Sequence, residues 1–100
     1  MKESYFSADN IQNKALQMRQ QIQEGIQKRD SRYYANRSAL LVLDMQSYFL
    51  SPTSHAFIPS GAALLPNICT LIEAFAARHR PIVFTRHLNT PQDAGQMSFW

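Results

Sequence analysis

The chain has 100 residues, of which 45% are hydrophobic, so its composition is that of one small globular domain and not of a disordered segment. Ten Lys and Arg against seven Asp and Glu give a formal charge of +3, and the cations are scattered along the chain. Their densest local set is Arg29, Arg32 and Arg37, interleaved with Tyr33 and Tyr34. A solvated connector is the ordinary interpretation of such a set, and we expect no nucleic-acid partner.

The single cysteine, Cys69, excludes an internal disulfide, which suits a reducing compartment. No apolar stretch approaches the ~18 residues of a membrane span, and the amino-terminal residues lack the apolar core of a secretion signal. We therefore expect a cytoplasmic protein with no membrane partner.

The first predicted element is an amphipathic helix over about residues 10–28, with Ser7 and Asp9 as candidate N-caps. Its narrow apolar stripe recurs at helical spacing: Ile11, Ala15, Met18, Ile22 and Ile26. A stripe of this width packs on the body of the same protein or on a partner subunit, which favours a homo-oligomer. A polar connector follows over residues 29–37.

The first predicted strand is residues 38–43, where five apolar residues run without a break. Such a run predicts a strand buried on both faces, as in the middle of a parallel sheet. Asp44 follows at the carboxyl end of this strand, the edge at which open α/β sheets bind ligands. Two interpretations of Asp44 stay open from this pattern: a cap for the next turn, or a general acid or base in a partly dry pocket.

Residues 45–50 predict a turn or one helical turn, and residues 51–60 a loop. A second helix, of about twelve residues, should begin between Ser60 and Pro66, because proline suits a first helical turn. Its wide apolar face consists of Ile68, Leu71, Ile72, Phe75 and Ala76. The basic residues Arg78, His79 and Arg80 suit the last turn, where cations complement the helix dipole, and Pro81 ends the helix.

Residues 82–85, Ile-Val-Phe-Thr, predict a second buried strand. Strand, helix and strand make a βαβ unit, whose crossover should be right-handed. His87 follows the second strand, so Asp44 and His87 should emerge at the same edge of the sheet.

The other chemical candidates are weaker. Cys69 falls in the middle of the second helix, with no neighbouring cation or helix N-terminus to activate it, so we interpret it as structural. The three histidines show no metal-ligand spacing, and the isolated glycines form no phosphate-binding loop. We therefore expect neither a metal nor a cofactor.

Three segments in order resemble the isochorismatase-like hydrolases: Leu41-Val42-Leu43-Asp44-Met45-Gln46 with Tyr48-Phe49-Leu50, then Pro81-Ile82-Val83-Phe84-Thr85-Arg86-His87, then Asp93-Ala94-Gly95-Gln96-Met97 with Trp100. The resemblance covers residues 38–100, which divides the chain into a helix and connector (1–37) and the first part of a hydrolase domain (38–100). It implies a three-layer α/β/α fold with a parallel central sheet, of which this chain holds the first βαβ unit. Two strands alone make no stable open sheet, so we expect a fragment, a split chain or a truncated sequence.

The resemblance also implies a catalytic set of Asp, Lys and Cys, in which Asp44 matches the Asp that takes the proton from the thiol. The thiolate attacks a carbonyl, and water resolves the acyl-enzyme. The Lys and Cys of the set match no residue here, Cys69 included, so these 100 residues alone should be inactive. Phe49, His87 and Trp100 are then the candidates for lining a pocket that binds a small-molecule substrate.

Three functions follow from these observations. The first is a hydrolase of the C–N bond of a small amide, and the second is a vinyl-ether hydrolase of the isochorismate type. Members of the second kind tend to carry Gln where this chain has His87, which favours the amide hydrolase. The third is a non-catalytic assembly subunit that associates through its amino-terminal helix.

Overall fold

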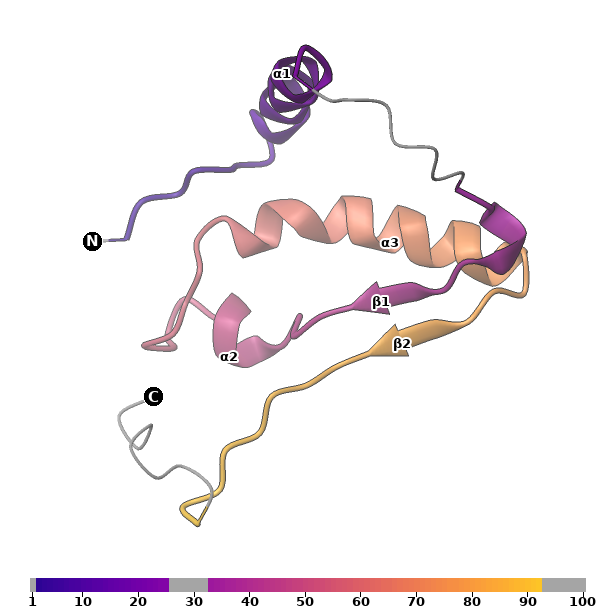
Figure 1. Cartoon of the computed structure of the whole chain (residues 1–100). Helices are drawn as coiled ribbons and strands as arrows, with labels where there is room; N and C mark the ends of the chain where they lie inside the picture. The colour runs from indigo at the N-terminus through magenta and orange to yellow at the C-terminus, as the bar shows by residue number, and fades with distance from the viewer. Residues whose placement is uncertain (1, 26–32, 93–100) are drawn as a thin grey trace.

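The apolar segments of the sequence form helices and strands that alternate along the chain, which gives a small α/β arrangement. The computed structural model describes residues 2–25 and 33–92. In chain order the elements are α1 (Ile11–Gln23), the 3₁₀ turn η1 (Ala35–Arg37), β1 (Leu40–Val42), α2 (Ser47–Leu50), α3 (Gly61–Ala77) and β2 (Ile82–Phe84). β1 and β2 pair in parallel, with Leu41 opposite Val83, and α3 connects them (Figure 1). The predicted βαβ unit is confirmed, and so is the helical turn expected within residues 45–50.

The sheet is covered on one face only among the described residues. Val42 is 6% exposed, whereas its neighbours Leu41 and Leu43 are 56% and 59% exposed. Adjacent residues of a strand point to opposite faces, and α3 packs against one of them. The prediction of a strand buried on both faces is therefore wrong for this structure. The strands are also shorter than the predicted 38–43 and 82–85.

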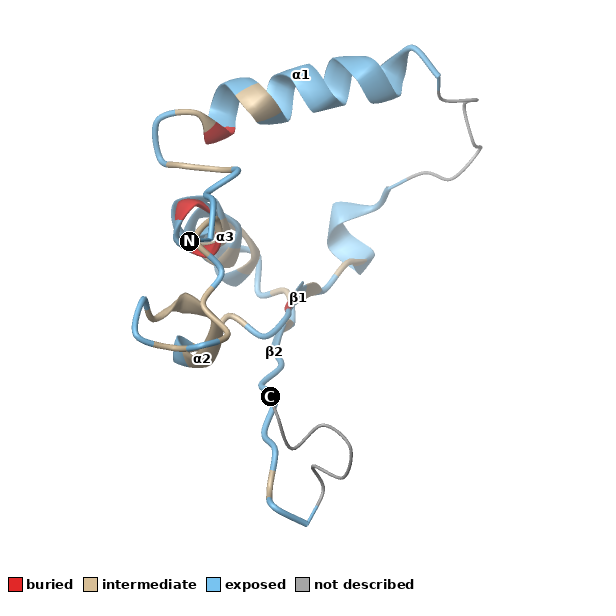
Figure 2. Ribbon diagram, turned by 90° about the vertical axis from the view of Figure 1, so that its left-hand side faces the viewer, coloured by how far each residue is buried: buried red, intermediate tan, exposed pale blue. Residues whose placement is uncertain are grey.

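Helix α1 packs against the rest of the described chain only near its first residues. Ile11 is buried, while the later stripe residues Met18 and Ile22 are exposed (Figure 2). The apolar stripe expected to pack is thus covered only at its start. Helix α1 ends at Gln23, so the predicted helix over residues 10–28 is wrong at Glu24 and Gly25. The rest of the predicted continuation, including Ile26, lies outside the described residues, as do Arg29 and Arg32.

The N-cap of α1 differs from the predicted residues. It is Asn10, not Ser7 or Asp9, and it makes no side-chain cap hydrogen bond. Asn10 Oδ1 instead accepts the Ser7 N–H at 2.8 Å, and the Ser7 carbonyl accepts the Ile11 N–H at 3.0 Å. The asparagine side chain therefore closes the turn that leads into the helix.

Helix α3 is longer than expected, with 17 residues from Gly61. Pro66 is its sixth residue and not part of its first turn, so the predicted placement of this proline is wrong. Pro66 has no N–H to donate to the carbonyl of Ala62. Only the first four N–H groups of a helix lack partners in any case, so the proline at the sixth position removes one hydrogen bond from the helix.

The carboxyl end of α3 is a Schellman motif built on a histidine. The Arg80 N–H donates to the Phe75 carbonyl at 2.9 Å, and the His79 N–H donates to the Ala76 carbonyl at 2.9 Å. His79 has φ 51°, in the left-handed region where glycine is usual. The three residues predicted to form the last turn therefore lie beyond the helix, which ends at residue 77.

We predict that His79→Gly raises the free energy of unfolding by about 0.5–1 kcal/mol, because glycine adopts the left-handed conformation without a Cβ clash. Urea denaturation measures the change. The control is Arg78→Gly, whose φ of −100° already suits any residue. That variant should be no more stable than the parent, and a His79→Gly variant that unfolds at the parental urea concentration would contradict the prediction.

Candidate functional site

The residues that follow the two strands meet at the carboxyl edge of the sheet. The Thr85 N–H donates to the Val42 carbonyl at 2.9 Å, and the Asp44 N–H donates to the Thr85 carbonyl at 3.2 Å. The parallel hydrogen-bond ladder therefore continues past the ends of β1 and β2. Asp44 and His87 leave the sheet at the same edge, as the order of the strands predicts.

The side chain of Asp44 is held by the hydroxyl of Thr85. Thr85 Oγ1 donates to Asp44 Oδ1 at 2.8 Å and accepts the main-chain N–H of Asp44 at 3.1 Å. One hydroxyl can fill both roles because it carries one donor and two lone pairs. The carboxylate is thus fixed relative to its own backbone, through one of its two oxygens.

The backbone of Asp44 is strained. Its φ is 53°, a left-handed conformation that costs an ordinary residue roughly 1–2 kcal/mol and that Asp tolerates better than most. Helix α2 begins after Gln46, its N-cap, and has no side-chain cap hydrogen bond. The interpretation of Asp44 as a cap for that turn is therefore wrong. Strain of this kind persists where the surroundings enforce it, and it gathers at functional sites.

Gln46 adds a further rung beyond the strands. Its Nε2 donates to the His87 carbonyl at 3.0 Å, and its Oε1 accepts the His87 N–H at 2.8 Å. The side-chain amide thus takes the place of a peptide group in the ladder. Neither Gln46 nor Thr85 has a site role predicted from the sequence. The available signal was the position of each polar residue near the carboxyl end of a predicted strand: Thr85 is the last residue of 82–85, and Gln46 lies three residues after 38–43.

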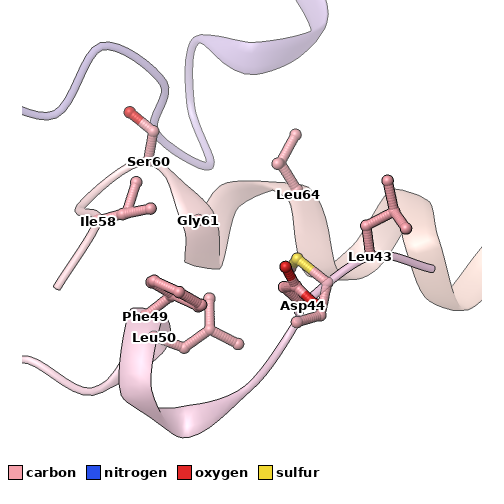
Figure 3. A pocket seen from close by; sticks show the side chains of 9 residues that line it. Leu43, Asp44, Phe49, Leu50, Ile58, Ser60, Gly61 and Leu64 are labelled. Carbon is pink, nitrogen blue, oxygen red and sulfur yellow. The ribbon is translucent and has the colours of Figure 1, made fainter. Parts of the chain in front are cut away.

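A cavity of about 320 Å³ opens beside Asp44 (Figure 3). It lies between the end of β1, helix α2, the loop before α3 and the first turn of α3. Its lining is Leu43, Asp44, Met45, Phe49, Leu50, Ile58, Ser60, Gly61 and Leu64. Among these described residues Asp44 is the one ionisable group. Asp44 is itself exposed, so the partly dry pocket expected around it is not found in the described part of the chain.

Two backbone features bring the walls of the cavity together. The Ile58 N–H donates to the Phe49 carbonyl at 2.8 Å, which ties the loop to α2. A Cβ at Gly61 would lie 2.8 Å from Leu50 Cδ2, so the absence of a side chain lets α3 begin directly against α2. The apolar residues of the lining converge because of these two close approaches.

The four candidate site residues do not all lie together. Phe49 lines the cavity that contains Asp44. His87 lines a separate depression of about 230 Å³, together with Gln46, Tyr48, Leu88 and Asn89. Trp100 lies outside the described residues, as does the segment 93–97 that carries part of the family resemblance.

Cys69 is exposed on α3 and lines neither of these two cavities. Within residues 2–25 and 33–92, no group of three or more His, Cys, Asp or Glu side chains could hold a metal ion. No helix in the same residues is long and apolar enough to cross a membrane.

Comparison with known proteins gives one match. Residues 38–100, more than half of the chain, match the family model described as the isochorismatase domain. No curated protein and no solved structure matches the chain. The matched residues include both strands, α2 and α3, and therefore the whole lining of the cavity beside Asp44.

We predict that Gln46→Leu accelerates hydrogen exchange of the His87 amide about tenfold, because the variant removes the acceptor for that N–H. Gln46→Glu is the matched control, since its carboxylate still accepts from His87 while the donor to the His87 carbonyl is lost. Exchange measured by NMR should be slower in the Glu variant than in the Leu variant. Equal rates in the two variants would show that the side-chain rung does not protect this amide.

Proposed function

Because the chain belongs to the isochorismatase-domain family, we propose that it forms part of a hydrolase that cleaves a C–N, amide-type bond of a small molecule, with Asp44 as the catalytic base. The observation that carries the proposal is the position of Asp44. Its carboxylate stands at the carboxyl edge of the sheet, is fixed by Thr85, and faces an apolar cavity large enough for a small ligand.

In the proposed reaction Asp44 takes the proton of a cysteine thiol, and the thiolate attacks the amide carbonyl. The C–N bond breaks as the proton passes to the leaving amine, and water then hydrolyses the thioester to a carboxylic acid. The family resemblance implies this cysteine and a lysine, and neither matches a residue of the chain. The chain's own contribution is therefore the base, its support by Thr85, and one wall of the substrate site.

The lining of the cavity favours a neutral amide over an anionic substrate. Asp44 is the only ionisable group among the described residues that line it, and the others are apolar except for Ser60. A negatively charged ligand would meet a carboxylate of the same sign without a compensating cation from these residues. The cavity therefore supports amide hydrolysis over vinyl-ether hydrolysis of an anionic, isochorismate-like substrate.

The open face of the sheet supports a larger architecture. Leu41 and Val83 are opposite each other in the register, so their side chains share one face, and both are exposed. An apolar sheet face of this kind is stable in water when a further layer packs on it. We include in the proposal a three-layer α/β/α fold, in which α3 lies on one face and further helices cover the other.

We predict that Asp44→Asn lowers turnover of small neutral amides by roughly 10²–10⁴-fold while the fold is retained. Asparagine tolerates the left-handed backbone and can still accept the Thr85 hydroxyl hydrogen bond, but it cannot take a proton. Ammonia release measures turnover in the full-length protein. Turnover near the parental value in a folded Asp44→Asn variant would rule out Asp44 as the base.

Cys69→Ala is expected to keep activity within about twofold of the parent, because Cys69 is exposed on α3 and lies outside the cavity lining. The same ammonia assay applies. A folded but inactive alanine variant would make Cys69 the nucleophile and would overturn the proposed origin of the thiol.

A further inference from the structure

The amino-terminal segment, residues 2–6, is bound to the loop behind the cavity. Lys2 Nζ donates to the carbonyls of His55 and Phe57, each at 2.8 Å. These two carbonyls flank one residue of the loop, so a single ammonium group joins both sides of its bend. An ammonium suits this position because it offers three donors and a full charge to the two carbonyl oxygens.

A second anchor joins the same segment to the start of α3. The Phe6 N–H donates to Ser60 Oγ at 2.9 Å. Ser60 is the N-cap of α3 but makes no side-chain cap hydrogen bond. Its hydroxyl is turned toward the amino-terminal segment (Figure 3). Ser60 also lines the cavity, so the segment touches the cavity wall from outside.

A third anchor fixes the segment to α1. Lys14 Nζ donates to the Tyr5 carbonyl at 2.5 Å and lies 3.9 Å from the centre of the Tyr5 ring. This combines a charge-assisted hydrogen bond with a cation–π contact. The segment is therefore held from both sides, by α1 and by the loop, and Lys2 is presented to the loop from a fixed backbone.

The loop held by Lys2 supplies a wall of the cavity. Ile58 directly follows Phe57, whose carbonyl Lys2 binds, and its side chain lines the cavity beside Asp44. The Ile58 N–H is bonded to Phe49, and the Ile58 carbonyl accepts the Gly61 N–H at 2.9 Å. A shift of the loop at residues 55–57 therefore strains the hydrogen bond that holds Ile58 beside Phe49.

We propose that Lys2 is a positioning residue for the substrate cavity: it fixes the loop so that Ile58 forms the wall opposite the carboxylate of Asp44. Lys2 touches neither the cavity nor Asp44, and it acts through the main chain of residues 55–58. The kinetic consequence rests on the proposed amide hydrolysis, whereas the structural consequence does not. The amino-terminal segment thereby belongs functionally to the site, although it precedes the family match at residue 38.

The test compares Lys2→Met, which keeps the aliphatic stem and loses the donors, with Lys2→Arg, whose guanidinium can donate to both carbonyls. Glu3→Gln is the neighbouring control. In Lys2→Met, exchange of the Ile58 amide should be about fivefold faster. The Thr85 amide in the sheet should exchange at the parental rate, which shows that the fold is kept. Lys2→Arg should restore the parental Ile58 rate.

The kinetic arm uses benzamide as the probe, with ammonia release measured in the full-length protein. Lys2→Met should raise KM about fivefold and leave kcat within about twofold, because Asp44 and Thr85 are untouched. Lys2→Arg should recover the parental KM, and Glu3→Gln should not change it. An unchanged Ile58 exchange rate in Lys2→Met overturns the proposal. Faster exchange with an unchanged KM also overturns it, since Lys2 would then be a structural contact alone.

Different results contradict the proposed amide hydrolysis and the proposed role of Lys2. Absence of ammonia release from benzamide and other small neutral amides by the parent protein contradicts the proposed function. The exchange arm still decides the role of Lys2 in that case, because faster exchange of Ile58 in Lys2→Met supports the positioning of the cavity wall and parental exchange excludes it.

Discussion

The parallel pairing of β1 with β2 is the constraint on which the rest of the site depends. The pairing continues beyond both strands, first through the main chains of Asp44 and Thr85 and then through the side-chain amide of Gln46. Each added rung fixes one polar residue at the carboxyl edge of the sheet. The left-handed backbone of Asp44 is tolerated because it is held by these bonds on both sides, and the carboxylate is directed by a hydroxyl from the neighbouring strand.

Three sets of local contacts hold the walls of the cavity together. A glycine at the start of α3 lets that helix approach α2, and a main-chain hydrogen bond draws the following loop onto α2. Lys2 and Phe6 bind the same region from the outer side. Among the described residues, apolar walls are therefore gathered around one carboxylate, that of Asp44.

Much of this arrangement follows from local pattern. The two apolar strand runs and the helix with a wide apolar face between them predict a βαβ unit, and strand order alone brings Asp44 and His87 to one edge. Prediction failed where a choice depended on neighbours in space. Pro66 lies inside α3 because the helix already begins at Gly61, where the absence of a side chain allows contact with Leu50 of α2. Leu41 is exposed because α3 covers one face of the sheet in the described residues.

The residue types and their spacing determined the class of fold, the order of the elements and the location of Asp44 at a strand end. These properties depend on the period at which apolar and polar residues alternate along the chain. That period is set by residues close together in the sequence. The folded chain alone decided that Thr85 orients the carboxylate, that His87 lies in a depression apart from Asp44, and that Lys2 reaches the loop beside Ile58. Such contacts join residues about 40 to 55 positions apart, and no local pattern encodes which of many polar groups will meet.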